Sequence, residues 1–285
     1  MHNDKRTIQF CSCSSGSSGN SYVVATENAA ILVDAGTTGK NMVSGLNKCG
    51  LSAGDLDGIF LTHEHHDHIR GLPVIIKEAN KREPLLRSTK RELRVYGSSG
   101  TIAATESKLF SKTELSEAYI LGSPLDVIQI QDMKVTPFRL SHDAAEPMGY
   151  RIDAYGKSLA IVTDTGYITE SIFAGISDVD FLVLEANHEK NILLMGNYPY
   201  NLKTRILGDY GHLSNESAGE ALTRILQMRN KPISVALAHL SSENNTPDMA
   251  RVTVKNILFE NDYMEGRDYS LTVLKRDIVG DVIRI

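Results

Sequence analysis

The sequence predicts an α/β fold, and two observations lead to that prediction. Short apolar runs bounded by Gly, Asn or Ser recur along the chain, as they do in β-strands. Segments with helical spacing of apolar residues lie between these runs. The chain has 285 residues, 41% of them hydrophobic and 23% charged, which is typical of a globular protein. Because no linker or low-complexity run divides it, we expect one domain spanning residues 1–285.

The N-terminal part of the chain predicts strands around one helix. The runs SYVVAT, AAILVDAG and GIFLTH predict strands at 21–26, 29–36 and 58–63. Between the second and the third, residues 41–49 place Met42 and Leu46 on one helical face, and Gly50 supplies a helix C-cap.

The rest of the chain continues the α/β alternation. Strands are expected at 93–97, 134–140, 148–154, 158–164, 180–186 and 233–239. Helices are expected at 101–110, 168–175, 215–229 and 247–261. Several later strands carry Asp, Glu or His at their C-terminal ends, where α/β proteins build their sites. We therefore expect the chemistry along that edge.

Charge and hydropathy restrict the partners of the protein. The formal net charge of -5 excludes a surface that is basic throughout, so contact with nucleic acid would need a local patch. The N-terminal segment lacks the apolar core of a signal peptide, and no run of about 18 apolar residues occurs. We expect a soluble, cytoplasmic protein without a membrane partner. The three cysteines Cys11, Cys13 and Cys49 cannot all pair, and we interpret them as buried free thiols.

A histidine cluster, Thr-His-Glu-His-His-Asp-His at 62–68, directly follows an apolar strand. Four of the nine histidines of the protein fall within it. In an extended loop, residues two apart point the same way, so His63 and His65 can hold one metal ion. The neighbouring Asp67 and His68 can turn toward a second ion. The cluster predicts a site for two divalent metal ions, with a histidine-rich surface loop as the alternative.

The spacing His-x-His-x-Asp-His after an apolar strand resembles the signature of the metallo-β-lactamase superfamily. The likeness extends along the chain, because His142, Asp164 and His239 each end a strand and are similar to the remaining ligands of that family. It implies a four-layer αββα sandwich. It also implies a ligand set for two ions: His63, His65 and His142 for one, Asp67, His68 and His239 for the other, and Asp164 shared. Asp34 matches an early acid that orients a ligand, although a turn-forming Asp explains it equally well.

The chemistry implied by this resemblance suits phosphate esters. Two metal ions about 3.5 to 4 Å apart lower the pKa of a bridging water and clamp a phosphoryl oxygen while the hydroxide attacks. Asp67 is placed to orient that water as well as to bind metal. His212 is our candidate for the proton donor to the leaving group, because it precedes a helix that Ser214 caps; a capping-loop histidine is the alternative.

Further motifs narrow the resemblance to one branch. The Gly-His-Leu-Ser-Asn-Glu stretch around His212 resembles the extra histidine motif of phosphodiesterase branches, including tRNA-processing ribonucleases. The segments that look like the bacterial WalJ/YycJ group, over essentially the whole chain, are 14–21, 185–188, 198–206 and 239–245. This likeness implies a DNA exonuclease that acts on 5′ ends.

Contacts to a nucleic-acid substrate are expected at several polar positions. The candidates are Asn20, Ser21, Asn187, Lys203 and Arg205. A basic stretch follows the metal motif, with Lys77, Lys81, Arg82, Arg87, Lys90, Arg91 and Arg94 against three glutamates. A solvated helix face explains this stretch equally well.

Competing functions remain open within the same fold. Only 75 residues separate Asp164 from His239, too few for the large inserted domain of the RNase J type of nuclease. A small-molecule hydrolase acting on a cyclic phosphodiester or a thioester is the main alternative, followed by an RNA-processing nuclease. A binding module without activity would need a replaced ligand, and none is replaced. Ligation by histidine and carboxylate without thiolate suits Zn, Mn and Fe alike, and the sequence does not determine the oligomeric state.

Overall fold

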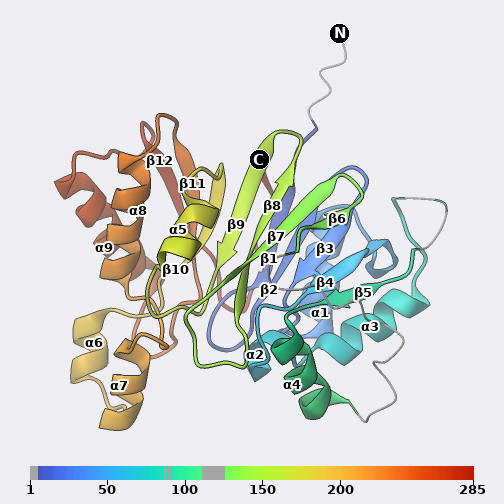
Figure 1. Cartoon of the computed structure of the whole chain (residues 1–285), viewed down its shortest axis with the longest axis horizontal. Helices are drawn as coiled ribbons and strands as arrows, with labels where there is room; N and C mark the ends of the chain where they lie inside the picture. The colour runs from blue at the N-terminus through green and yellow to red at the C-terminus, as the bar shows by residue number, and fades with distance from the viewer. Residues whose placement is uncertain (1–5, 87, 89–90, 111–125) are drawn as a thin grey trace.

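A computed structural model of the chain describes residues 6–86, 88, 91–110 and 126–285 (Figure 1). Two β-sheets pack face to face, and helices cover the outer face of each sheet. This arrangement is the predicted four-layer αββα sandwich. The described residues contain no helix that is both long enough and apolar enough to span a lipid bilayer.

The first sheet comes from the N-terminal part of the chain, closed by one strand from the C-terminus. Its strands in spatial order are β13 (Ile283–Arg284), β1 (Gln9–Ser14), β2 (Ser21–Ala25), β3 (Ala30–Val33), β4 (Gly58–Phe60) and β5 (Arg94–Tyr96). The pairs β1–β2 and β2–β3 are antiparallel, whereas β3–β4 and β4–β5 are parallel. The carboxyl ends of β3 and β4 therefore meet at one edge.

The second sheet is formed by the rest of the chain. Its strands in spatial order are β12 (Tyr269–Val273), β11 (Ile233–Ala238), β10 (Phe181–Glu185), β9 (Lys157–Val162), β8 (Met148–Ala154), β7 (Met133–Arg139) and β6 (Ile128–Ile130). β9, β10 and β11 run parallel to one another. β8 is antiparallel to both β7 and β9, so β7 ends at the same edge as β9.

Helices cover the two outer faces. Those packed on the first sheet are α1 (Gly39–Lys48), α3 (Leu72–Lys81) and α4 (Ser99–Leu109). Those packed on the second sheet are α5 (Glu170–Ile176), α8 (Asn215–Gln227) and α9 (Pro247–Glu260). The shorter elements are the 3-10 turn η1 (Ala53–Asp55), α2 (His66–Ile69), α6 (Lys190–Met195) and α7 (Tyr200–Leu207). Figure 1 shows α6 and α7 beyond the end of the second sheet.

The core between the sheets follows from strand alternation. Tyr22 and Val24 of β2 belong to the cluster between the sheets, whereas Val23 between them packs under the helices of the first sheet. Aromatic rings join the two sheets: those of Phe10 and Phe181 have centroids 5.1 Å apart. Such pairs prefer tilted contacts and add to the hydrophobic gain of burial.

The predicted strands are confirmed, but several end earlier than the sequence suggested. The strands expected to reach 36, 63, 164 and 239 end at residues 33, 60, 162 and 238. At three of these ends the chain turns through a residue with positive φ, which breaks the extended conformation. The elements that the sequence analysis did not predict are β1, β6, β12, β13, η1, α2, α3, α6 and α7. The three cysteines are buried and free, as expected.

Candidate metal centre

The predicted ligands meet at the edge where the carboxyl ends of both sheets converge. His63 follows β4, His142 follows β7, Asp164 follows β9 and His239 follows β11. Each sheet supplies one side of the site, because these strands end at the same edge of the sandwich. The fold therefore brings together residues up to 176 positions apart in the sequence.

Three site residues have an unusual backbone conformation. Asp34, Asp164 and His239 adopt φ values of 60°, 62° and 56°, in the left-handed region. Side chains other than glycine rarely adopt this region, and residues that do so cluster at functional sites. Each lies just beyond the end of a buried strand, where the turn redirects its side chain.

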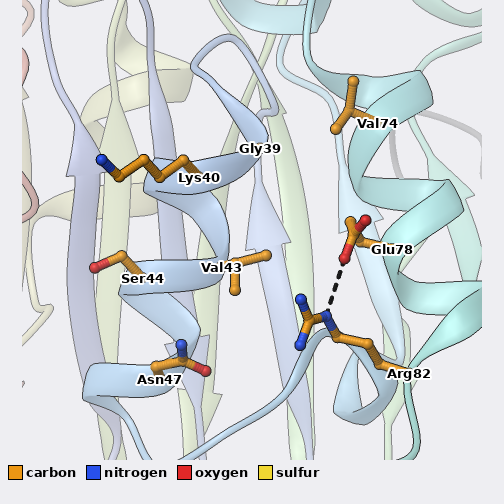
Figure 2. Close-up of a pocket in the computed structure, with 8 residues that line it drawn as sticks. All are labelled: Gly39, Lys40, Val43, Ser44, Asn47, Val74, Glu78 and Arg82. Carbon is orange, nitrogen blue, oxygen red and sulfur yellow. Dashed lines mark hydrogen bonds and ion pairs between the residues drawn. The ribbon is translucent and has the colours of Figure 1, made fainter.

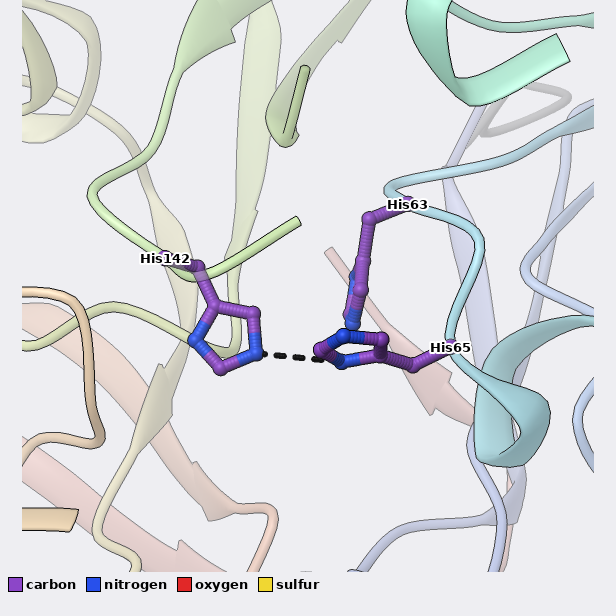
Figure 3. A group of neighbouring side chains, drawn as sticks. All are labelled: His63, His65 and His142. Carbon is purple, nitrogen blue, oxygen red and sulfur yellow. Dashed lines mark hydrogen bonds between the residues drawn. The ribbon is translucent and has the colours of Figure 1, made fainter. Parts of the chain in front are cut away.

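His63, His65 and His142 form the first group of converging side chains (Figure 3). One ring nitrogen from each lies within 4.8 Å of the others, a spacing that one metal ion could bridge. Nε2 of His142 faces Nδ1 of His65 at 3.3 Å. His63 is fully buried, and His65 is half-buried.

Asp67, His68 and His239 form the second group, with the same 4.8 Å limit on their donor atoms. Oδ2 of Asp67 lies 3.5 Å from Nε2 of both histidines. Asp164 lies between the two groups: one of its oxygens is 3.1 Å from Nε2 of His68, and the other is 3.7 Å from Nε2 of His142. This position is the one that a shared ligand needs.

Asp34 orients His68 by binding the ring nitrogen that faces away from the centre. Its Oδ2 lies 2.8 Å from Nδ1 of His68, so Nε2 faces the centre. The same carboxylate accepts hydrogen bonds from the backbone N–H and the hydroxyl of Thr62, each at 2.8 Å. Such outer contacts fix the tautomer and the ring orientation of a ligating histidine.

The other histidines that face the centre through Nε2 are held in the same way. Nδ1 of His142 lies 3.0 Å from the carbonyl oxygen of Gly211. Nδ1 of His239 lies 2.9 Å from Oε1 of Glu185, and Nδ1 of His63 lies 3.0 Å from the Thr62 hydroxyl. Each ring therefore directs Nε2 toward the space between the two groups.

The charges around this space favour a cation. Burial opposes protonation of His68, but the carboxylates around it, Asp34 first, raise its pKa well above the usual value. Burial also opposes protonation of His239, yet the carboxylates of Asp164, Asp67 and Glu185 raise the pKa of this histidine to about 10. Burial disfavours the ionised form of Asp164, and the surrounding histidines nevertheless hold its pKa well below the usual value. A divalent cation would supply the positive charge that these carboxylates stabilise.

An unsatisfied buried atom supports the fit of the site to a metal ion. Among the described residues, Nε2 of His63 is buried without a hydrogen-bond partner. Burying polar atoms without partners costs free energy, and functional groups are a common reason for such exceptions. His63 belongs to one group of potential ligands that also includes His68 and Asp164. Histidine nitrogens and carboxylate oxygens are the donors that divalent transition metals prefer.

His212 lies beside the centre, and its ring is held by the same carboxylate oxygen that holds His239. Its Nδ1 lies 2.8 Å from Oε1 of Glu185 and 3.4 Å from Oδ1 of Asp164, and its side chain is 16% exposed. The loop that carries His212 lines the site, because the carbonyl oxygen of Gly211 contacts His142. His212 is thus near the predicted metal ligands, with its other ring nitrogen directed away from Glu185.

Glu185 is a site residue that the sequence analysis did not single out. It is fully buried, and its Oε2 accepts hydrogen bonds from the backbone N–H groups of Thr165 and Leu213. Burial opposes its ionisation, but His212 and His239 lower its pKa to about 2. An acid at the end of the run DFLVLE was the available signal, at the edge where sites are expected.

Asn20 and Ser21, predicted to contact substrate, are both fully buried. The Asn20 amide lies 3.4 Å from Oδ2 of Asp67 and 3.0 Å from Nε2 of His68. The same side chain closes the 16–20 loop through two hydrogen bonds with the backbone of Gly16. Asn20 therefore contacts two members of the second group, Asp67 and His68, through its side-chain amide.

The remaining predicted contacts are also engaged within the protein. Asn187 donates a hydrogen bond to the carbonyl oxygen of His239 at 2.9 Å. Lys203 donates to carbonyl oxygens at the end of α6, and Arg205 forms an ion pair with Asp143. Arg205 thereby lies beside the loop of His142, whereas Lys203 ties α7 to α6.

Three arginines of the basic stretch after the metal motif form ion pairs in the part of the chain that the structure describes. The ion pairs are Arg82 with Glu78, Arg91 with Asp57, and Arg94 with Glu92. Arg87 and Lys90 lie outside the described residues. A groove of about 510 Å³ between α1 and α3 has Lys40, Asn47 and Arg82 in its lining (Figure 2), and it includes none of the predicted metal ligands.

Two packed sheets with clustered histidines and carboxylates at one edge define a class of metal-binding hydrolases. Residues 29–233 match the family described as the beta-lactamase superfamily domain, and the chain belongs to that superfamily. Within it, the chain belongs to the WalJ/YycJ branch. It is 36% identical to exodeoxyribonuclease YycJ of Bacillus anthracis, over 93% of this chain and 94% of that protein. It is 38% identical to exodeoxyribonuclease WalJ of Streptococcus pneumoniae, over 93% of each chain.

A comparison with solved structures gives the same fold. The metallo-beta-lactamase fold protein YhfI from Bacillus subtilis superposes with a TM-score of 0.67, over 96% of this chain and 99% of that one, at 18% identity. The predicted family and fold class are thereby confirmed.

Proposed function

We propose that this protein is a metal-dependent DNA exonuclease that degrades strands from their 5′ ends. The observation that carries the proposal is the convergence of all seven predicted ligands on one space, with His212 and Glu185 beside it. The named activity of two relatives that match over nearly the whole chain supports DNA as the substrate.

Two ions would be held by the two groups. His63, His65 and His142 would bind one, and Asp67, His68 and His239 the other, with Asp164 between them as the shared ligand. Two divalent ions supply an activated water and charge stabilisation for the phosphoryl oxygens. Zn, Mn and Fe all suit this donor set, which contains no thiolate.

Other side chains of the protein would orient the ligands and supply the proton. Asp34, Gly211 and Glu185 keep three ligand rings in place by binding the nitrogen that faces away from the centre. His212 holds a proton at the ring nitrogen directed away from Glu185 and donates it to the leaving alkoxide oxygen. Glu185 stays ionised and stabilises the protonated ring of His212.

The proposal is tested by offering several phosphodiesters to the purified protein. The protein is incubated with Mn and separately with Zn, together with 5′-phosphorylated duplex DNA, single-stranded DNA, RNA and a cyclic dinucleotide. We expect the DNA substrates to be shortened from their 5′ ends. Hydrolysis of the cyclic dinucleotide alone would overturn the proposal in favour of a small-molecule phosphodiesterase, and cleavage of RNA alone would identify an RNA-processing nuclease.

A further inference from the structure

Two exposed tyrosines stand on the loops that carry site residues. Tyr167 lies three residues after Asp164 and is 47% exposed. Tyr210 lies two residues before His212 and is 66% exposed. Large aromatic side chains contribute most when buried, so two of them exposed beside one site need an explanation.

The backbone segments that carry the two tyrosines are packed together. A Cβ added at Gly166 would lie 2.2 Å from the carbonyl oxygen of Asp209, so the backbones on either side are in contact. The Gly166 N–H donates to the carbonyl oxygen of Ser141, and the Ser141 hydroxyl donates to that of Asp209. The two tyrosines therefore start from neighbouring points on one well-anchored surface.

The same surface carries a metal-ligand loop. The backbone N–H of Asp143, which follows His142, donates to the carbonyl oxygen of Tyr210 at 3.1 Å. The carbonyl oxygen of Tyr167 accepts a hydrogen bond from Thr165, which follows Asp164 directly. Both tyrosines are thus fixed at their backbones beside the loops that position the candidate ligands.

The two tyrosine side chains have no polar or aromatic partner among the described residues. Within the part of the chain that the structure describes, neither tyrosine hydroxyl has a hydrogen bond, and neither ring stacks on another aromatic ring. Each side chain is therefore partly open to solvent on a loop that also carries a site residue. Proteins that bind single strands use aromatic side chains in such positions to stack bases, since every base offers a π face.

We propose that Tyr167 and Tyr210 form a stacking platform for an unpaired base beside the phosphodiester that is cleaved. This inference rests on the proposed nuclease function and deepens it, because it assigns to the enzyme a substrate whose terminal bases are unpaired at the site. Stacking is independent of sequence, so the platform would hold a strand end without selecting particular bases.

A kinetic comparison tests the platform. The variants are Tyr210→Ala and Tyr210→Phe. Phe259→Ala, which removes an exposed aromatic ring on α9, is the control. Each is assayed on an oligonucleotide and on the same oligonucleotide with abasic terminal positions. We expect Tyr210→Ala to raise KM for the normal substrate about 10-fold with little change in kcat, within the range for one stacked base. Tyr210→Phe, which keeps the stacking face, and the control should match the wild type. On the abasic substrate all variants should have the same KM.

A binding measurement gives a readout that does not depend on turnover. The protein contains no tryptophan, so Tyr210→Trp creates a single indole reporter that can still stack. An oligonucleotide with slowly cleaved phosphorothioate linkages should quench its emission, and an abasic counterpart should quench it far less. The same experiment on Phe259→Trp should show no quenching by either strand.

The failure of the platform and the failure of the nuclease function are distinguishable. If the wild-type protein cleaves DNA, but Tyr210→Ala has an unchanged KM or an equal increase on both substrates, the platform is wrong and the nuclease function stands. If the indole is not quenched while fluorescence polarisation of a labelled strand shows binding, the platform is likewise wrong. If the wild type neither binds nor cleaves any oligonucleotide, the proposed function itself is overturned.

Discussion

Oε1 of Glu185 lies 2.8 Å from Nδ1 of His212, the partly exposed histidine beside the predicted metal ligands. The ring of His212 is bound on the side nearest the centre and 16% exposed, as a proton donor to a leaving group would need. Glu185 also binds His239 at 2.9 Å, so it connects the proposed proton donor with a proposed metal ligand.

Replacing His212 and Glu185 should therefore have different consequences. His212→Ala should lower kcat by about 10²- to 10⁴-fold, the range for loss of a general acid, and leave the metal content unchanged. Glu185→Gln should impair both turnover and metal binding, because an amide places N–H donors where the carboxylate now accepts from His239 and two backbone N–H groups. Oligonucleotide digestion measures turnover, and elemental mass spectrometry measures the metal. Loss of metal in His212→Ala would instead identify His212 as a ligand.

Asp67→Ala should abolish metal-dependent activity altogether. Its carboxylate lies between His68 and His239, and a buried pair of histidines without it would hold the second ion with fewer ligands. We expect about one half of the wild-type metal to remain in the isolated variant, because only the second ion loses a ligand, with the αββα fold retained in circular dichroism. A variant that cleaves DNA normally would remove Asp67 from the mechanism. Treatment of the wild type with a chelator, followed by return of the metal, serves as the control.

Asp34→Asn tests orientation of a ligand without removing one. Asparagine tolerates the left-handed backbone at this position and has nearly the same size. Its amide group cannot accept all three hydrogen bonds that the carboxylate receives from Thr62 and His68. Metal affinity should fall about 10- to 100-fold, as measured by competition with a chromogenic chelator. Unchanged affinity would indicate that Asp34 only shapes the turn.

The sequence allowed prediction of residues that share a local motif. His63, His65, Asp67 and His68 lie within six positions, so their spacing after a strand is visible without any knowledge of the fold. His142, Asp164 and His239 were found because each ends a predicted strand and resembles a family ligand. Glu185 ends a strand too, but its partner His212 lies 27 residues later, and the two meet because the segment that follows β10 pairs with the segment that follows His212.

The predicted substrate contacts show where sequence reasoning fails. Asn20 lies in a Ser- and Gly-rich segment, which suggests an exposed loop, yet the loop folds under the site and the residue is fully buried. Arg205 looked available for phosphate, but the fold places Asp143 beside it. Burial and charge pairing depend on which loops meet in space. Tyr167 and Tyr210, in contrast, are unremarkable in the sequence and become notable only through their exposure beside the site.

Gly36→Ala should lower the stability of the protein and should also disturb the second group, Asp67, His68 and His239. A Cβ at Gly36 would lie 1.6 Å from the carbonyl oxygen of Asp67, far inside any permitted contact, so the two backbones cannot keep their present approach. Overpacking of this kind costs about 1–3 kcal/mol, and here the atoms that must move are backbone atoms of the metal motif. Urea unfolding should show the loss of stability, and metal affinity should fall in parallel. Gly280→Ala is the matched control, because its nearest neighbour would be 3.6 Å away; equal destabilisation of both variants would contradict a specific role for the close approach at Gly36.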